Sequence, residues 1–550
     1  MAEVKNAKKK VTKDVVVAVE KKPTTKKPTQ AKTPVAKKAP KVEVKSQVKI
    51  EEKKKAVIVK EEKKVEVIKN VEKVDSPYKV LFVASEAGPF IKTGGLGDVA
   101  GALPRALTEQ GVDARVILPL YMDIPQDFKS NMQYIGNCYV PLSWRYQYCG
   151  VFTYKYEGVR YYFIDNEYYF KRHGLYGHFD DGERFAFFSK AVLECLKIID
   201  FYPDCLHVND WQSALVPVFL DCYYRGVEEY KGIKTLFTIH NIEFQGQYGD
   251  GVISDILGFN NDQANLVRYK GCANYMKGGI ESANKVNTVS PSYAKEILDP
   301  FYGYGMQDIL KARQYKLSGI VNGIDVNKNN PEVDKALFKN YGINSLDDKA
   351  MNKVALQGLL GLPQNADVPM IGMVGRLTHQ KGIDLLIAVM DKVLSRNLQL
   401  VILGTGDWKY ENMLKDMQNQ YPGKLRAIIN FSSDMASKIY GASDMFLMPS
   451  KFEPCGLSQM IAMRYGTVPI VRETGGLKDT VIPYNHVDKT GNGITFRTFN
   501  ADDMLFAIER AVGLYNDYKE DWKNVVINGM NCDFSWNNIA KQYIELYKNL

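Results

Sequence analysis

Short apolar strands that alternate with amphipathic helices set the fold class of this chain from Tyr78 onward. Strands that are apolar on both faces are typical of a parallel sheet covered by helices on each side. In the first half we predict a helix over Asp98–Gln110 and strands at Tyr78–Ala84, Ala114–Pro119, Cys205–Val208 and Lys234–Ile239. The pattern restarts near residue 330, with strands at Met370–Val374, Leu398–Leu403, Ala427–Asn430, Met445–Met448 and Val468–Val471. The chain is therefore predicted to be an α/β protein with two doubly wound, Rossmann-like halves and a ligand between them.

The first 75 residues have a different composition. They hold 23 Lys and 11 acidic residues, without Gly or aromatic residues, for a net charge of +12. Such a segment buries too little apolar surface to compensate the entropy lost on folding, so we predict that it is disordered. It lacks the apolar core of a signal peptide and is a poor match to a transit peptide, which favours the cytoplasm over a plastid. Two roles stay open for this tail: binding to an unknown anionic surface, or solubility alone.

The rest of the chain is almost balanced in charge. The whole chain carries +9, whereas residues 76–550 hold 49 basic and 52 acidic residues, a net of −3. This balance argues against a groove for nucleic acid. The eight cysteines show no C-x-x-C pair or other metal-ligand spacing, so we expect reduced thiols and no metal. No run approaches the roughly 18 apolar residues of a membrane span.

A glycine-rich segment, Lys92–Asp98 (KTGGLGD), follows the first predicted strand. Gly94 and Gly95 would let the backbone approach a diphosphate, while Lys92 adds positive charge and the next helix offers free N–H groups. The segment is neither G-x-G-x-x-G nor a P-loop. We interpret it as an anion site; the alternative is a tight turn in which the glycines serve packing only.

Two loops of the second half have a similar character. Arg376 and Lys381 lie in Gly375–Gly382 (GRLTHQKG), directly after a predicted strand, where two cations suit a leaving diphosphate. Thr474–Leu477 (TGGL) is a second Gly-Gly turn that enters a helix and offers backbone N–H groups. Solvated loop charges and an ordinary turn are the structural alternatives.

Three further polar residues, Asp210, His240 and Glu453, come just after predicted strands. Each of them alone is more often structural or solvated than catalytic. Together they lie at strand carboxyl ends, where doubly wound sheets bind ligands. The chain has no D-x-D sequence, which disfavours a glycosyltransferase that carries a metal on that motif, and no G-x-S-x-G or H-E-x-x-H sequence.

Five motifs follow one another along the chain: Lys92–Asp98, Asn322–Asp325 (NGID), Gly375–Gly382, Pro449–Leu457 (PSKFEPCGL) and Thr474–Leu477. With them the chain closely resembles bacterial glycogen synthases and plastid starch synthases from about Tyr78 to the C-terminus. The resemblance implies a GT-B fold and a retaining transfer of glucose from ADP-glucose to an α-1,4-glucan. It also implies that neither a metal nor pyridoxal phosphate is needed.

The resemblance implies a division of the chain as well. After the tail (1–75) we expect an acceptor-side domain (76–325), a nucleotide-sugar domain (326–525) and a final segment (526–550) that returns to the first domain. Helical spacing of apolar residues in this last segment suits that role.

The resemblance further implies a role for each motif residue. Arg376 and Lys381 would neutralise the departing diphosphate, and Glu453 would lie beside the donor glucose. His240 would line the reacting sugar, and Asp210 would contact the acceptor. The remaining donor contacts would come from Lys92, Gly94, Gly95, Asp98, Asn322, Thr474, Gly475, Gly476 and Leu477.

One position departs from the pattern of retaining enzymes of this fold. Many carry Glu-x7-Glu, but the second Glu is Ile461 here, which weakens any prediction of a ribose or base contact from that helix. Two other functions stay open: the same reaction with UDP-glucose, and a non-catalytic glucan-binding scaffold. Phosphorylases that use pyridoxal phosphate fit less well, because the halves are small.

Overall fold

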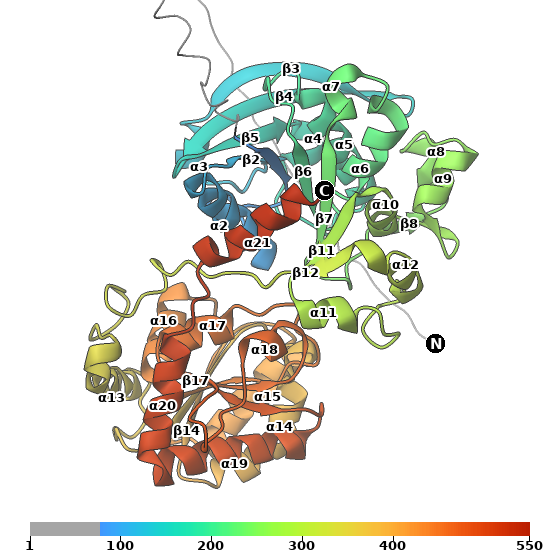
Figure 1. Ribbon diagram of the computed structural model, residues 1–550. Helices are drawn as coiled ribbons and strands as arrows, with labels where there is room; N and C mark the ends of the chain where they lie inside the picture. Colours follow the sequence, from blue (N-terminus) through green and yellow to red (C-terminus); the bar gives the residue numbers. More distant parts are fainter. Residues whose placement is uncertain (1–76) are drawn as a thin grey trace, which may run out of the picture. The chain divides into compact units, whose positions relative to one another are not determined.

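The computed structural model describes residues 77–550, so the predicted disordered tail lies outside the described residues. The first sheet contains β1 (Lys79–Val83), β2 (Asp113–Pro119), β3 (Gln133–Leu142), β4 (Arg145–Tyr156), β5 (Val159–Asp165), β6 (Cys205–Asn209), β7 (Lys234–Ile239), β11 (Lys285–Thr288) and β12 (Leu317–Gly319). Its order is β12-β11-β7-β6-β1-β2-β5-β4-β3 (Figure 1). The chain changes direction across the sheet between β1 and β6, and the carboxyl ends of these two strands form a topological switch point.

The second sheet contains β13 (Met370–Val374), β14 (Gln399–Leu403), β15 (Leu425–Ile428), β16 (Met445–Met448), β17 (Val468–Arg472) and β18 (Ile494–Phe496). All six strands are parallel, in the Rossmann order β15-β14-β13-β16-β17-β18. The switch point of this sheet lies between β13 and β16. Both sheets confirm the prediction of two doubly wound halves.

Helices connect the strands. Those of the first half are α2 (Gly95–Glu109), α3 (Gln126–Lys129), α4 (Glu167–Phe170), α5 (Asp181–Cys195), α6 (Leu215–Phe219), α7 (Glu228–Lys231), α8 (Gly251–Asp255), α9 (Asn261–Val267), α10 (Tyr275–Ser282), α11 (Pro291–Glu296) and α12 (Gln307–Ala312). Those of the second half are α13 (Lys349–Leu359), α14 (Ile383–Leu394), α15 (Trp408–Gln420), α16 (Ser433–Ala442), α17 (Ser458–Arg464), α18 (Gly475–Thr480), α19 (Ala501–Asp517), α20 (Lys519–Met530) and α21 (Trp536–Lys548). None of the helices in residues 77–550 is both long enough and apolar enough to cross a membrane.

The nine predicted strands are all present, but the predicted start of the first helix was wrong. Helix α2 begins at Gly95, three residues before the expected Asp98, so the glycine-rich segment forms its first turn. A Cβ atom at Gly97 would lie 2.4 Å from the Cβ of Lys92. Only glycine fits where this turn packs against its own loop, and that packing overrides the low helix propensity of glycine.

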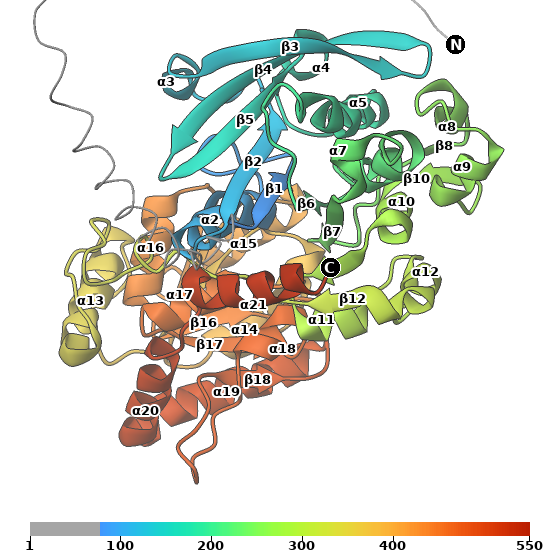
Figure 2. The ribbon, with the colours of Figure 1, turned by 45° about the horizontal axis from the view of Figure 1, so that its top comes forward.

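The sequence pattern did not predict the antiparallel edge of the first sheet. Strands β3 and β4 add to β5 in antiparallel pairing, and Figure 2 shows them curving over one end of the sheet. Most of their residues are exposed or half-buried, so they lack the continuous apolar runs used to predict strands. A small separate sheet of β8 (Gln247–Gly249), β10 (Cys272–Asn274) and β9 (Arg268–Tyr269) is a further difference.

The last helix, α21, packs against the first half of the chain, next to α2 (Figures 1 and 2). The Tyr547 hydroxyl lies 2.9 Å from Nδ1 of the buried His207 on β6. Ahead of this helix, the backbone N–H of Ile324 donates to the carbonyl of Phe534. These contacts support the division of the chain into two halves and a returning helix, which we propose as its domain structure.

Candidate active site

The switch point of the second sheet holds an ion pair between the half-buried Lys381 and the buried Glu453. Lys381, at the end of the loop after β13, places its Nζ 2.6 Å and 2.9 Å from the two carboxylate oxygens of Glu453. Ser450 donates to the same carboxylate at 2.9 Å. Glu453 is only 7% exposed, so these partners compensate the loss of hydration of its charge.

A pocket of about 190 Å³ opens beside this ion pair. It is lined by Met373, Val374, Gly375, Arg376, Lys381, Leu447, Met448, Ser450 and Ser458. Arg376 is exposed and donates to Oε1 of Gln380 at 3.3 Å, but it forms no ion pair with any residue of 77–550. The pocket thus offers one guanidinium without an acidic partner and one ammonium shared with Glu453, an arrangement suited to an anion.

The Gly-Gly turn of the second half packs tightly on the Glu453 loop. Thr474 precedes the first residue of α18, and Gly475 has a φ of 44°. Cβ atoms at Gly475 and Gly476 would lie 2.0 Å and 2.2 Å from the carbonyl oxygens of Glu453 and Cys455. The glycines are therefore required by the close approach of two backbone segments, which gives weight to the structural alternative, an ordinary turn.

An acidic residue of the first half covers the N-terminus of α18. The N–H of Gly475 donates to Oε1 of Glu296 at 2.9 Å, and the hydroxyl of Thr474 lies 3.1 Å from the same oxygen. Burial raises the pKa of Glu296, although these hydrogen bonds oppose the shift. An anionic ligand that uses the Gly475 N–H must displace this carboxylate.

The glycine-rich segment of the first half leaves its backbone accessible. Gly94 and Gly95 are exposed, and a Cβ atom at Gly95 would have no heavy atom within 4 Å. The ammonium of Lys92 pairs with Asp98 at 2.8 Å, with both side chains well exposed. Such a pair is easily opened, so Lys92 is available to a ligand.

The buried Glu86 holds the glycine-rich segment in place through hydrogen bonds to Thr93. Its carboxylate accepts hydrogen bonds from the N–H and the hydroxyl of Thr93, at 2.5 Å and 2.8 Å. Burial raises the pKa of Glu86, and the Thr93 hydrogen bonds act in the opposite direction. Glu86 lies outside the quoted motif and was not predicted. Its position just after β1 is the sequence signal that could have identified it.

Asp210 and His240 lie together at the ends of β6 and β7. Asp210 has a φ of 56°, and its Oδ1 accepts the backbone N–H of His240 at 2.7 Å. Nε2 of His240 lies 3.0 Å from Oδ1 of Asn209. Burial raises the pKa of Asp210 to about 7 and lowers the pKa of His240 to about 3. His240 is therefore a neutral ring that donates from Nε2 to Asn209 near neutral pH.

Asn322 connects the two halves. Its backbone N–H lies 3.4 Å from the Sγ atom of Cys455, and its side chain is buried. Its Oδ1 atom has no hydrogen-bond partner within the described part of the chain. A buried acceptor without a donor is unfavourable, so this atom suits a ligand hydroxyl or a cation.

The predicted site residues thus form three local groups: Lys92 with Asp98, Asp210 with His240, and Arg376, Lys381 and Glu453 with the Thr474–Leu477 turn that packs on the Glu453 loop. No hydrogen bond or ion pair in residues 77–550 joins the Lys92–Asp98 pair to the Lys381–Glu453 pair. The two pairs lie at the switch points of different sheets. Sequence reasoning missed Glu86, Asn209, Glu296, Ser450 and Cys455 as neighbours of the site, although Ser450 and Cys455 lie inside a quoted motif.

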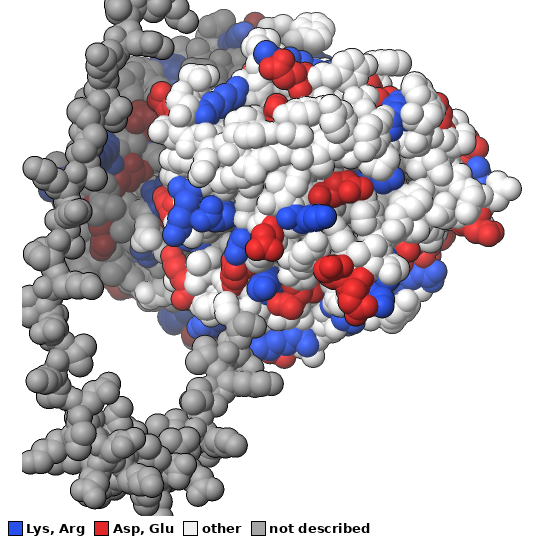
Figure 3. All heavy atoms as spheres, turned by 90° about the horizontal axis from the view of Figure 1, so that it is seen from above, with Lys and Arg blue, Asp and Glu red and all other residues white. Residues whose placement is uncertain are grey.

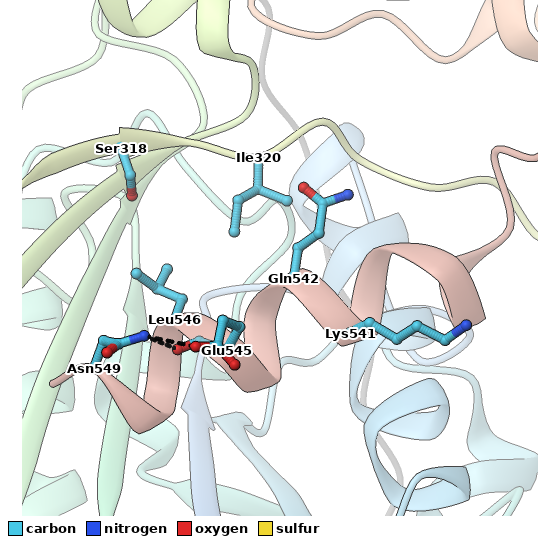
Figure 4. A pocket seen from close by; sticks show the side chains of 7 residues that line it. All are labelled: Ser318, Ile320, Lys541, Gln542, Glu545, Leu546 and Asn549. Atoms are coloured by element: carbon cyan, nitrogen blue, oxygen red, sulfur yellow. Dashed lines mark hydrogen bonds between the residues drawn. The ribbon is translucent and has the colours of Figure 1, made fainter.

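A second, larger pocket of about 510 Å³ lies between β12 and α21 (Figure 4). It is lined by Ser318, Ile320, Lys541, Gln542, Glu545, Leu546 and Asn549. None of these residues belongs to a predicted motif, and Asn549 donates to Glu545 on the same helix. Reactive groups converge at the smaller pocket, which we take as the candidate site.

Comparison with known proteins identifies the family. Residues 79–312 match the family model of the starch synthase catalytic domain, and residues 361–525 match glycosyl transferases group 1. The glycogen synthase of Clostridium acetobutylicum is 52% identical over 477 residues, covering 86% of this chain and 100% of that protein. The chain belongs to the glycogen and starch synthase family.

Other members of the family agree with this assignment. The glycogen synthase of Clostridium perfringens is 50% identical over 474 residues, covering 86% of this chain and 98% of that protein. The solved catalytic domain of starch synthase IV from Arabidopsis thaliana, bound to ADP and acarbose, is 33% identical with a TM-score of 0.80, covering 86% of this chain and 99% of that one. The resemblance seen in the motifs is confirmed, as is the GT-B fold. This family member is a glucosyltransferase that adds glucose to a glucan.

Proposed function

We propose that this glucosyltransferase uses ADP-glucose and extends the non-reducing end of an α-1,4-glucan with retention of configuration. The pocket at the second switch point carries the proposal, because it is lined by Arg376 and Lys381 and Lys381 pairs with Glu453 beside it. The solved relative bound to ADP and acarbose supports the nucleotide and the sugar class.

In this reaction Arg376 and Lys381 hold the diphosphate. Charge develops on the phosphate oxygen as the bond to the glucose C1 atom breaks, and fixed cations stabilise that charge most in the transition state. Lys381 is the better oriented of the two, since Glu453 fixes its ammonium. The Arg376 side chain, without an acidic partner, must be ordered by the substrate itself.

Glu453 lies beside the reacting carbon in this proposal. As C1 gains oxocarbenium character, a nearby carboxylate stabilises the positive charge. The incoming glucan hydroxyl forms the new bond to C1 on the face that the phosphate leaves. Its proton passes to the departing phosphate oxygen, so atoms and charge balance without a separate protein base.

The first half supplies the remaining contacts. Lys92, Gly94, Gly95 and Asp98 meet the donor from the opposite side. The neutral ring of His240 lies by the reacting sugar, and Asp210 contacts the acceptor. The free acceptor atom of the buried Asn322 accepts a hydroxyl of the donor glucose.

The Thr474–Leu477 turn is the second donor contact. Residues Thr474, Gly475, Gly476 and Leu477 lie against phosphate or sugar hydroxyls in this proposal. The N–H groups of Thr474, Gly476 and Leu477 donate to backbone carbonyls, so the Gly475 N–H is the one that a phosphate can take over. Glu296 accepts the Gly475 N–H in the described structure, so donor binding in our proposal exchanges that carboxylate for a phosphate oxygen.

We further propose that the reaction needs neither a metal ion nor pyridoxal phosphate, since Arg376 and Lys381 supply the charge that a metal would bring. Full activity after dialysis against a chelator would support this. With bacterial glycogen synthases as relatives, we place the enzyme in the cytoplasm. The partner of the basic tail is proposed to be an anionic surface.

The decisive experiment measures nucleotide release with glycogen as acceptor, from ADP-glucose and from UDP-glucose in parallel. A much higher kcat/KM for ADP-glucose than for UDP-glucose supports the proposal. A higher kcat/KM for UDP-glucose would change the proposed donor but not the proposed glucosyl transfer. Release of neither nucleotide, by a protein that still binds glycogen, would support a non-catalytic scaffold.

A further inference from the structure

Three thiols gather where β3, β4 and α5 meet, away from the strand ends that carry the proposed site. They belong to Cys138, Cys149 and Cys195, and their Sγ atoms all lie within 4.8 Å of one another. The Cys149 and Cys195 sulfurs are 3.6 Å apart. The spacing of these residues along the chain gave no sign of a cluster, because three different elements contribute one thiol each.

The three thiols differ in their surroundings. Cys149 and Cys195 are 0% exposed, whereas Cys138, on the edge strand β3, is partly exposed. Hydrogen bonds from the two buried thiols lower the pKa of Cys138, and donating them raises the pKa of Cys149 and Cys195. Ionisation within the cluster is therefore favoured at Cys138, the one of its three residues that is partly exposed.

The strand register favours one covalent pair. Cys138 and Cys149 are direct partners in the antiparallel pairing of β3 and β4. Opposed residues in such ladders have Cα atoms about 4.5–5.5 Å apart, which lies within the range of about 4.4–6.8 Å seen in disulfides. Bonding these two sulfurs requires rotation of side chains and no rearrangement of the strands.

We propose that Cys138 and Cys149 form an oxidation site, at which a hydroperoxide converts the two thiols to a disulfide. The Cys138 thiolate attacks the O–O bond and becomes a sulfenic acid, and the alkoxide or hydroxide that leaves takes a proton from water. The Cys149 thiol then attacks the sulfenic sulfur; its proton leaves with the hydroxyl group as water, and the S–S bond forms.

Cys195 is a positioning residue in this site. Its thiol hydrogen-bonds within the cluster and stabilises the Cys138 thiolate, but it remains reduced. A bound metal ion is the less favoured use of the same atoms, because it requires proton loss from both buried thiols close to Asp165, whose charge opposes ionisation of Cys149. The disulfide is neutral, so it places no charge in the interior.

The test uses the full-length, reduced protein treated with hydrogen peroxide in the presence of a chelator. We expect the count of free thiols, measured after denaturation, to fall from eight to six, and peptide mapping to recover Cys138 joined to Cys149. Cys138→Ser should abolish this loss. Cys149→Ser should leave a sulfenic acid at Cys138 that dimedone traps.

Further variants make the outcome decisive. Cys222→Ser alters a partly buried thiol outside the cluster and should oxidise like the unmodified chain. Cys195→Ser should slow oxidation and move its pH profile to higher pH, an effect that a merely structural role would not produce. The proposal is wrong if the mapped disulfide excludes Cys138 or contains Cys195, if no disulfide forms, or if the purified protein holds one zinc ion that protects the thiols. Circular dichroism of each variant verifies the fold.

Discussion

Arg376 and Lys381 are both positively charged, but they differ in burial and in their partners. The Arg376 guanidinium is exposed and lacks an acidic partner among residues 77–550, whereas the ammonium of Lys381 neutralises the buried Glu453. Replacing Arg376 removes a contact to the leaving group. Replacing Lys381 removes such a contact and also leaves a buried carboxylate without its partner, which is costly in itself.

We therefore expect Arg376→Ala and Lys381→Ala each to lower kcat by about 10²–10³-fold, the usual loss for one electrostatic stabiliser. Lys381→Ala should in addition lower the free energy of unfolding, and Arg376→Ala should not. Steady-state kinetics and urea denaturation measure the two effects. Lys409→Ala, which removes an exposed cation on α15, is the control. Near-normal kcat in both variants would contradict the assignment.

The Asp210 carboxyl makes stability depend on pH. Its folded-state pKa of about 7 lies above its usual value of 3.8. Between these values the folded state binds more protons than the unfolded state, so the free energy of unfolding falls as pH rises through this window. In Asp210→Asn the amide oxygen still accepts the His240 N–H but cannot ionise.

The Asn variant should therefore gain stability over the unmodified chain as pH rises, by about 1–3 kcal/mol at pH 8 relative to pH 4. Urea denaturation at a series of pH values measures this difference. Asp416→Asn, at an exposed position of α15, is the control. A difference independent of pH would show that Asp210 is ionised in the folded state throughout.

At the scale of elements, α21 is held by a polar contact inside the core. Tyr547 bonds to Nδ1 of His207, while Nε2 of the same ring lies 2.7 Å from the Thr238 hydroxyl. Tyr547→Phe keeps the ring but leaves Nδ1 without a partner. We expect a loss of about 1–3 kcal/mol in the free energy of unfolding. Urea denaturation tests this, with Tyr518→Phe, at an exposed ring, as the control. Equal stability of the two variants would mean that water or another group replaces the Tyr547 hydroxyl.

The contact between α11 and α18 competes with donor binding in our proposal. Glu296 covers the Gly475 N–H, and Ser292 on the same helix bonds to Asp479. If a phosphate oxygen displaces Glu296, then Glu296→Ala should lower the KM for ADP-glucose by about fivefold, equal to about one hydrogen bond. Initial rates at saturating glycogen measure this KM. Ser292→Ala weakens the helix contact without uncovering Gly475 and should leave KM unchanged. A raised KM in Glu296→Ala would show that the carboxylate holds the turn in its binding shape.

Elements were predictable from the sequence where one physical signal dominated. Continuous apolar runs located nine of the parallel strands within two residues, because burial on both faces leaves that pattern. The parallel strands β5, β11, β12 and β18 were not predicted. The same rule overlooked β3 and β4, which expose part of each face. It also started α2 late, because close packing at Gly97 is a tertiary constraint that the local pattern does not contain. The motifs marked Lys381 and Glu453, but only the folded chain shows that they form an ion pair, or that Glu296 reaches α18.

At the scale of the whole chain, the positions of a few charged residues matter more for the proposed function than the net charge. On the face shown in Figure 3, basic and acidic side chains are interspersed, in keeping with the near-balanced charge of residues 76–550. Lys92 and Arg376 owe their proposed function to their places at the two switch points. The Lys-rich residues 1–75 lie outside the two family matches, which start at residue 79 and residue 361.

Removal of residues 1–75 tests the proposed binding of the tail to an anionic surface separately from the proposed reaction. The deleted segment carries +12, and the remaining chain of net charge −3 keeps every residue assigned to the reaction. We expect unchanged kcat and KM with ADP-glucose and a short soluble glucan, because contacts at the pocket act over less than the Debye length of about 8 Å. Binding to vesicles with anionic headgroups, measured by co-sedimentation, should be lost, and binding of the full chain should weaken steeply with salt. Replacing the tail lysines by glutamine is the control for length. A change in kcat on deletion would contradict this separation, since it would require the tail to act within reach of the reacting groups.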